Sequence, residues 1–422
     1  MLMRFSITTL GCKVNAYESR YYAQKLEELG FEEADSDLDV CIINTCTVTN
    51  TAAAKSRQMI HRARRRNPGA RIVVVGCYAQ TAEEEEKQKL QADLIIGARH
   101  KNELAARVLA LMTEDRSADL TSHEEGAGFE SMPIARFEGR NRAFLKIQDG
   151  CNQFCSYCAI PFARGRERSI SRDEALQLVQ ELEAAGHREI VLTGIHTGRW
   201  QGEQGEDLAD LLKDMLSVTT DVTFRISSIE ITEVTDGLIA LLSTEPRMMP
   251  HLHIPVQSAS NAVLQRMDRP YTVEEFEQRL DEIRRAVPDI SISTDVICGF
   301  VGESDAEFEE MMQTLRRMRF SFLHVFPYSQ RHGTKASRMG PPVDGTIQKE
   351  RAARLLELSK ELRMADMTRF REETVLVEQG ENGEYTGYTR QYHPVLIRCD
   401  RPLSGRVHGT LRPEDGRYIM EV

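Results

Sequence analysis

The amino-acid sequence predicts an α/β protein in three parts: an N-terminal doubly wound parallel-sheet domain, a central partial (βα)6 barrel and a small C-terminal β-barrel. Three observations support this prediction. Apolar strand-like runs alternate with helical patterns over residues 4–112. The alternation resumes at residue 143, with six strand-like runs. From residue 374, short strand-like runs are instead separated by Gly, Asn, Asp and Pro.

The first domain is expected to span residues 1–115. Its strands are expected at residues 4–10, 39–44, 71–75 and 93–96. Its helices are expected at residues 17–29, 52–66, 82–90 and 102–112. Residues 116–137 lack hydrophobic periodicity and contain Ser, Gly and Glu, which predicts a linker.

The central barrel is expected to span residues 138–370. Its strands are expected at residues 143–148, 189–192, 223–226, 251–254, 291–297 and 321–326. Three of the intervening helices begin with sequences typical of capping boxes, namely Ser171 with Glu174, Thr272 with Glu275, and Ser304 with Glu307. Six strand–helix units are two short of a closed barrel, so we expect an open one that a helix at residues 348–369 completes.

The last domain is expected to span residues 371–422 and to be a small β-barrel. Its strands are expected at residues 375–378, 383–388, 393–398, 406–410 and 418–422. Tyr385, Tyr388 and Tyr392 of this domain either stack on nucleic-acid bases or pack its small core.

The sequence shows no export signal, which favours a cytoplasmic protein, and no segment expected to enter a membrane. No apolar run approaches the ~18 residues that span a bilayer, and 28% of the 422 residues are charged. Nine cysteines in such a chain favour metal binding or catalysis over disulfides. The net charge of −11 argues against a nucleic-acid partner, but residues 55–71 contain seven Lys or Arg and no acid.

A first cysteine trio consists of Cys12, Cys46 and Cys77, each at or just beyond the end of a predicted strand. The intervals of 34 and 31 residues correspond to about one strand–helix–strand unit each. Ligands of open parallel sheets bind outside the carboxyl ends of the strands, so the three thiols are expected to converge. Three thiolates can hold a 4Fe–4S cluster with one open iron. A zinc site and three buried structural cysteines are the alternatives.

A second cysteine trio has the spacing Cys-x3-Cys-x2-Cys and consists of Cys151, Cys155 and Cys158. It follows the first barrel strand directly, where barrel enzymes place their chemistry. Three thiolates again leave one iron of a 4Fe–4S cluster open, and that iron can chelate S-adenosylmethionine (SAM). An electron from the cluster can then release a 5′-deoxyadenosyl radical. Tyr157 is expected either beside the adenine of SAM or in ordinary packing.

The chain resembles the radical-SAM methylthiotransferases over nearly its whole length. The matching segments are residues 9–15 (TLGCKVN), 44–48 (NTCTV), 76–77 (GC), 144–166, 227–230 (SSIE), 253–258 (HIPVQS) and 326–329 (FPYS). The last domain resembles the TRAM fold, a small RNA-binding barrel. The form Gly-Cys-Lys-Val-Asn at residues 11–15 is similar to the branch that acts on N6-threonylcarbamoyladenosine beside the tRNA anticodon.

The resemblance implies two 4Fe–4S clusters and SAM as cofactors, with the six trio cysteines as metal ligands and Cys151, Cys155 and Cys158 as the catalytic set. It implies that one SAM methylates a sulfide on the first cluster. A second SAM then yields a radical that takes hydrogen from carbon 2 of the adenine. The resulting substrate radical captures the methylthio group. By position, Gly194, Ser228, Glu230 and Gln257 are expected near SAM.

The implied partners are tRNA, a flavodoxin- or ferredoxin-like electron donor and a sulfur source. Other branches of the family modify isopentenyladenosine or a ribosomal protein, and both remain alternatives. A non-catalytic RNA-binding protein with structural zinc is a third. Ala259, Cys298 and Val301 depart from the residues usual in the family, which leaves the exact SAM contacts open. Arg164, Arg166 and Arg168 are expected either to touch phosphate or to pair with acids.

Overall fold

The structure, a computed structural model, describes residues 2–114, 128–134, 136–137 and 139–422. Residues 116–127 of the expected linker lie outside the described residues. The chain forms two compact units. The first comprises Met1–Ile134, Gln148–Ile170 and Ser329–Thr334, and the second Ala135–Ile147, Ser171–Tyr328 and Lys335–Val422. The expected domain bounds 1–115, 138–370 and 371–422 stay a prediction.

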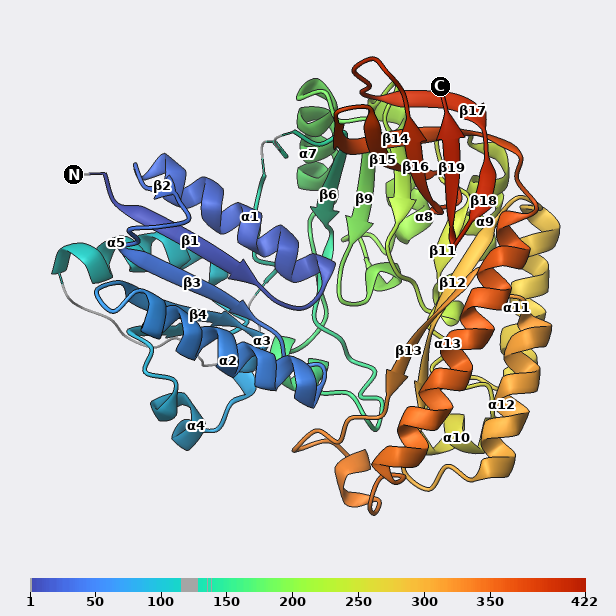
Figure 1. The fold of residues 1–422 in the computed structure, drawn as a ribbon, viewed down its shortest axis with the longest axis horizontal. Coiled ribbons are helices and arrows are strands. Elements are labelled where there is room, and N and C mark those ends of the chain that lie inside the picture. Colours follow the sequence, from blue (N-terminus) through green and yellow to red (C-terminus); the bar gives the residue numbers. More distant parts are fainter. Residues whose placement is uncertain (1, 115–127, 135, 138) are drawn as a thin grey trace. The chain divides into compact units, whose positions relative to one another are not determined.

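A five-stranded parallel sheet forms the centre of the first unit, which confirms the doubly wound prediction (Figure 1). Its strands are β1 (Arg4–Thr9), β2 (Glu32–Glu33), β3 (Val40–Thr45), β4 (Arg71–Gly76) and β5 (Leu94–Ile96). In the order β2-β1-β3-β4-β5, the chain adds β2 on one side of β1 and β3 on the other, so the strand order changes direction between β1 and β3. Such a reversal is where open α/β sheets bind ligands. Sequence patterning missed β2 because it is two exposed glutamates long.

Helices cover both faces of this sheet. They are α1 (Lys13–Glu28), α2 (Asn50–Arg66), α3 (Cys77–Thr81), α4 (Glu84–Lys89), the 3-10 turn η1 (Lys101–Glu103) and α5 (Leu104–Glu114). Ile60 of α2 and Tyr78 of α3 pack on alternate strand residues such as Cys41, Ile72 and Val74. Helices α1 and α5 contact each other. The helix expected at residues 82–90 is present as the shorter α4, and the sequence did not predict α3 before it.

The first unit also contains the loop that carries the second cysteine trio. Strand β7 (Gln148–Asp149) pairs antiparallel with β8 (Arg168–Ser169), and helix α6 (Ile160–Arg164) lies between them in sequence. The pairing of β7 with β8 brings the two ends of this loop together.

Six parallel strands in two three-stranded sheets form the barrel of the second unit. The first sheet contains β6 (Arg142–Lys146), β9 (Glu189–Thr193) and β10 (Thr223–Ile226), and the second contains β11 (His251–His253), β12 (Ser291–Cys298) and β13 (Phe322–Pro327). Strands β10 and β11 are in contact, so the sheets continue into one another. All six strands fall where the sequence predicts them, which confirms the partial barrel.

Helices follow these strands in sequence and have well-defined starts. They are α7 (Arg172–Ala184), α8 (Leu208–Val218), α9 (Asp236–Thr244), α10 (Asn261–Arg266), α11 (Val273–Ala286), α12 (Asp305–Met318) and α13 (Gly345–Met367), with 3-10 turns η2 (Thr197–Arg199), η3 (Ile231–Glu233) and η4 (Ala336–Arg338). Reciprocal capping boxes form at Thr272 and Ser304, as expected, and Ser171 accepts the amide of Glu174. In the described part of the chain, no helix is long and apolar enough to cross a membrane.

A curled six-stranded sheet makes up the C-terminal part of the second unit. It contains β14 (Glu372–Glu381), β15 (Glu384–Thr389), β16 (Pro394–Arg398), β17 (Arg406–Thr410), β18 (Arg412–Glu414) and β19 (Arg417–Glu421). All pairs are antiparallel except β16 with β19. The order β17-β14-β15-β16-β19-β18 leaves β17 and β18 as edges, so the sheet is a half-barrel rather than a closed barrel.

A buried carboxylate holds this sheet against the barrel. Glu189 of β9 binds Arg142 of β6 at 2.7 Å and Arg225 of β10 at 2.9 Å. Arg142 also pairs with Glu378 of β14 at 2.8 Å, and Arg225 donates to the carbonyl of Arg390 at 2.9 Å. Burial alone would raise the pKa of Glu189, but Arg225 and Arg142 lower it to about 2.

The tyrosines of the C-terminal sheet belong to this contact. Tyr388 and Tyr392 stack with ring centroids 4.6 Å apart, and the guanidinium of Arg142 lies over both rings. Arg225 lies 4.8 Å from the centroid of Tyr392. Tyr385 is buried in the core of the sheet. All three side chains therefore pack within the protein, which is the second of the two roles considered for them.

We predict that Glu189→Gln strongly destabilises the protein, because it leaves two buried guanidinium groups sharing a neutral partner. The carboxylate has a depressed pKa, so its contribution is present above the unfolded pKa near 4.5 and is lost as the pH falls towards 2. We expect a loss of about 3 kcal/mol at pH 7, measured by chemical denaturation of the metal-free chain.

The matched control is Glu361→Gln, which removes a surface ion pair with Arg316 and should change the unfolding free energy by less than about 1 kcal/mol. Equal effects of the two substitutions at pH 7 would contradict the role assigned to Glu189.

Candidate functional site

Three parallel strands of the first unit end nearly level at one edge of the sheet, and a cysteine follows each. The register aligns the last residues of β1, β3 and β4. Cys46 and Cys77 come directly after β3 and β4, and Cys12 comes three residues after β1. The first trio therefore gathers at the point where the strand order reverses, as the sequence predicts.

Two glycines let the loops of the first trio approach each other. Gly11 and Gly76 have φ angles of 104° and 102°, which favour glycine. A β-carbon on Gly11 would lie 2.9 Å from Cβ and 3.1 Å from Sγ of Cys46. A β-carbon on Gly76 would lie 2.7 Å from Asn44 Oδ1 and from the carbonyl of Thr45. Both positions exclude a side chain for reasons of space as well as backbone conformation.

Buried amide side chains hold these loops in place. Asn15 donates to the carbonyls of Leu10 at 2.7 Å and Thr45 at 3.0 Å, which joins the loop after β1 to the end of β3. Asn44 donates to the carbonyl of Asn15 at 2.9 Å and to Ser19 Oγ at 3.0 Å. Both residues lie in segments that match the family, at residues 9–15 and 44–48, but the sequence did not indicate this structural role.

The thiols of the first trio differ in exposure. Cys46 and Cys77 are buried, whereas Cys12 is exposed. Burial raises the pKa of Cys46, and it raises that of Cys77 to about 11 although Arg164 opposes the shift. Such thiols ionise when a metal ligates them. Three sulfur donors at one sheet edge, open on the side of Cys12, fit an iron–sulfur or zinc site.

The second trio lies on the loop between β7 and α6. The main-chain amide of Gln153 donates to Sγ of Cys151, and that of Ile160 donates to Sγ of Cys158. Both N···S distances are 3.4 Å. Cys155 is buried, and its carbonyl accepts the amide of Cys158 at 3.0 Å. Hydrogen bonds to cysteine sulfur are a feature of iron–sulfur sites, where they tune the reduction potential.

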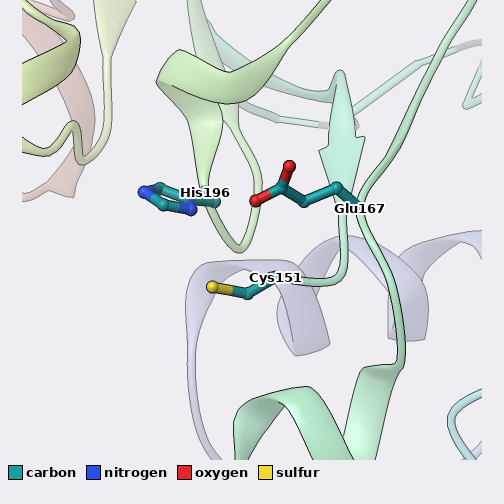
Figure 2. Close-up of side chains that lie close together, drawn as sticks. All are labelled: Cys151, Glu167 and His196. Carbon is teal, nitrogen blue, oxygen red and sulfur yellow. The ribbon is translucent and has the colours of Figure 1, made fainter. Parts of the chain in front are cut away.

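The loop is closed at its base. Gly150 has a φ angle of 78°, and a β-carbon there would lie only 2.0 Å from the carbonyl oxygen of Arg166. Figure 2 shows Cys151 beside Glu167, whose carboxylate accepts the amide of Asn152 at 3.1 Å. His196, labelled in the same figure, belongs to the second unit and pairs there with Glu233 at 2.7 Å.

A buried guanidinium links the two trios. Arg164, the last residue of α6, is fully buried, and its Nε lies 3.3 Å from Sγ of Cys77. Its Nη1 binds Glu18 of α1 at 2.8 Å and Asp149 of β7 at 3.2 Å. Its Nη2 binds Oδ1 of Asn15 at 2.8 Å. One side chain thus touches the first trio, the loop base of the second trio and helix α1.

Two further cations complete this buried cluster. Lys101 is fully buried and binds Glu18, and it lies 3.4 Å from Asp149. Arg168 lies 3.6 Å from Asp149. Glu130 and the buried Arg99 also act on Lys101 or Arg168, so cations and carboxylates alternate in this cluster, and Arg164 is the cation that faces Cys77. Arg164 and Arg168 pair with acids rather than face solvent, whereas Arg166 is exposed.

The residues expected near SAM lie in both units. Tyr157 is half-buried on the second-trio loop. In the second unit, Gly194, Ser228 and Gln257 follow β9, β10 and β11, at the carboxyl ends where barrel enzymes bind ligands. Glu230 lies at the same end, where it begins η3 and pairs with the buried Arg269. Their role in binding SAM stays a prediction.

The three positions that depart from the family are all buried. Ala259 and Cys298 are fully buried and Val301 is 5% exposed, so each contributes to packing. His253, which lies in one of the matching segments, pairs at 3.2 Å with Asp295 on the neighbouring strand β12, and the sequence did not predict this pairing. No spacing signal connects two residues so far apart in the chain.

Comparison with known proteins agrees with this geometry. Residues 4–97 match the model described as uncharacterized protein family UPF0004, and residues 145–315 match that of the radical SAM superfamily. A threonylcarbamoyladenosine tRNA methylthiotransferase MtaB from Bacillus subtilis (strain 168) is 40% identical over 94% of this chain and 91% of that protein. The chain belongs to the radical-SAM methylthiotransferase family. It is therefore an enzyme of a class that uses a 4Fe–4S cluster and SAM.

Two less similar proteins also match this chain. A tRNA-2-methylthio-N(6)-dimethylallyladenosine synthase of Endomicrobium trichonymphae is 33% identical over 96% of each chain. Among solved structures, the radical S-adenosylmethionine methyltransferase TsrM from Kitasatospora setae matches with a TM-score of 0.54 at 12% identity. That match covers 78% of this chain and 75% of TsrM, and it bears on the fold alone.

We predict that Arg164→Met destabilises the first unit by about 3–5 kcal/mol, because it removes the buried hydrogen bonds that Arg164 donates to Glu18, Asp149 and Asn15. Chemical denaturation of the metal-free chain measures the effect. Arg166→Met is the control, since Arg166 is exposed on the same segment and should cost less than about 0.5 kcal/mol. A small, equal loss for both variants would show that Arg164 does not hold the cluster together.

Proposed function

We propose that this enzyme adds a methylthio group to carbon 2 of N6-threonylcarbamoyladenosine beside the anticodon of tRNA. The observation that carries the proposal is the presence of two cysteine trios in one compact unit, connected by the buried Arg164. A transferase that forms a carbon–sulfur bond at an unactivated carbon needs one site that makes a radical and another that presents sulfur. Two trios with separate loops supply the ligands for two such sites.

The two trios fit two 4Fe–4S clusters. Cys12, Cys46 and Cys77 would hold the first, and Cys151, Cys155 and Cys158 would hold the second. When bound, SAM would supply the methyl group and the radical, and the clusters would pass on the electron and hold the sulfur that outside donors provide. The protein's own residues have positioning tasks: Asn15 and Asn44 fix the first loop, main-chain amides stabilise sulfurs of the second, and Arg164 offsets the negative charge of Cys77.

The remaining expected partners belong to the same proposal. Tyr157, Gly194, Ser228, Glu230 and Gln257 would contact SAM. The curled sheet at residues 371–422 would act as a TRAM-like RNA-binding domain, although its tyrosines are engaged internally. A flavodoxin- or ferredoxin-like protein would supply electrons, and a separate source would supply sulfur.

The nucleoside assignment rests on two comparisons. The relative named for threonylcarbamoyladenosine is 40% identical to this chain, and the relative named for dimethylallyladenosine is 33% identical. The Gly-Cys-Lys-Val-Asn form at residues 11–15 favours the same branch. Isopentenyladenosine is therefore the second candidate substrate.

We predict that tRNA from cells lacking this gene contains no methylthio-threonylcarbamoyladenosine and accumulates threonylcarbamoyladenosine instead, as measured by nucleoside mass spectrometry. The wild-type gene and a Cys399→Ala variant should restore the product, because Cys399 is buried in the core of the C-terminal sheet, away from both trios in sequence. A Cys155→Ala variant should not. An unchanged nucleoside profile in the deletion strain would refute the substrate assignment.

We predict that the two trios can be inactivated separately. Reconstituted wild-type protein should bind about eight irons per chain, and Cys77→Ala about four. Cys77→Ala should still cleave SAM reductively but form no methylthio product, whereas Cys155→Ala should lose SAM cleavage. Cys41→Ala, which alters a packed residue of β3, is the control and should retain about eight irons. Loss of SAM cleavage in Cys77→Ala would show that the trios are not separate sites.

A further inference from the structure

Helix α2 carries two groups of cations that differ in their surroundings. The first group is satisfied within the first unit. Arg57 lies 3.8 Å from Glu86 of α4, and Arg64 binds Asp93 at 2.5 Å and the carbonyl of Ala70 at 3.0 Å. These arginines fasten the helix to its neighbours and are not available to a ligand.

The second group, which we call the α2 basic face, consists of Lys55, Arg62, Arg65 and Arg66. All four side chains are exposed, and among the described residues none has an acidic partner. Helix α2 itself contains no Asp or Glu. At 3.6 residues per turn, Lys55, Arg62 and Arg66 project within about 40° of one another, with Arg65 beside them.

Helix stability does not explain this face. The helix dipole favours basic residues only in the last turn, which accounts for Arg65 and Arg66 but not for Lys55 or Arg62. Like charges one turn apart, as in Arg62 and Arg66, destabilise a helix by a few tenths of a kcal/mol. The chain as a whole has a net charge of −11, so an uncompensated basic face stands out from the rest of its composition.

The basic face begins at the first trio. Helix α2 starts at Asn50, four residues after Cys46, and its first turn is capped by Thr49. With a rise of 1.5 Å per residue, Lys55 lies about 8 Å and Arg66 about 24 Å along the axis from Asn50. The cations therefore form a track that leads outward from the first trio over a length that several phosphates of one strand would span.

We propose that the α2 basic face binds the phosphate backbone of the RNA substrate and guides it to the first trio. This inference rests on the proposed function, because it assumes that the substrate is RNA. Guanidinium groups bind phosphate through paired charge-assisted hydrogen bonds. Such contacts do not read sequence, so the face sets the path of the strand and the affinity rather than the choice of nucleoside.

The test compares the salt dependence of tRNA binding between variants. The α2 variant is Arg62→Gln, Arg65→Gln and Arg66→Gln combined. The probe is an unmodified transcript of a tRNA with adenosine on the 3′ side of the anticodon, and the readout is fluorescence anisotropy between 50 and 200 mM salt. Each lost phosphate contact lowers the slope of log K against log salt by about 0.7–0.9, so we expect a decrease of about 2–3.

Two further variants make the result specific. Arg285→Gln, Arg319→Gln and Lys349→Gln combined remove the same charge from three exposed cations of the second unit and should leave the slope unchanged. Substituting the three α2 arginines by Lys keeps the charge and should retain most of the slope. Iron content and tRNA-independent SAM cleavage should equal wild type in every variant, which excludes misfolding as the cause.

The possible failures are distinguishable. If the α2 variant keeps the wild-type slope, or if both triple variants reduce it equally, the α2 basic face does not bind phosphate. If the wild-type protein binds tRNA and modifies it without dependence on α2, only this inference is overturned. If the wild-type protein modifies no tRNA, the proposed function fails as well.

Discussion

The first unit depends on the buried charge of Arg164. A guanidinium cannot lose its proton in a protein, so its burial requires carboxylates around it. Glu18 and Asp149 meet that requirement, and they come from helix α1 and strand β7. Electrostatic pairing therefore acts together with the packing of α6 against α3 to set where α6 can lie. Because α6 follows the second trio directly, the same pairing fixes that loop relative to the first trio.

This arrangement changes how the cysteines should be regarded. Each trio gains its shape from a local feature, namely level strand ends for one and a closed loop for the other. Their common surroundings come from a long-range contact, since Arg164 and Glu18 are 146 residues apart in the chain. Arg164 next to Cys77 also opposes the rise in the pKa of this thiol that its burial creates.

Much of the fold was predictable from the sequence because local patterns specify it. The six barrel strands were found from apolar runs between helical patterns, and the caps at Thr272 and Ser304 from residues three positions apart. Features that depend on tertiary contacts were not predictable. Strand β2 has no apolar pattern, the half-barrel closure depends on which edges meet, and Tyr388 and Tyr392 show no sequence sign of the arginines that cover them.

In the site, too, features set by local sequence patterns were predictable and features set by tertiary contacts were not. The six cysteines were evident from spacing and from their position at strand ends, whereas Glu18 and Lys101 had no signal because their burial appears only after folding. The charge of α2 was visible in the sequence, but its separation into a paired and an unpaired face was not. That separation depends on Glu86 and Asp93, which belong to other elements of the unit.

The ion contacts of Glu189 have a mechanical consequence for the C-terminal sheet. Many accessory domains hang on flexible linkers and act by raising the local concentration of their ligand. This sheet is instead pinned to strands β6, β9 and β10 through Arg142, Glu189 and Arg225. A surface fixed in this way keeps a constant distance from the barrel, so any molecule bound to it would be held at that distance.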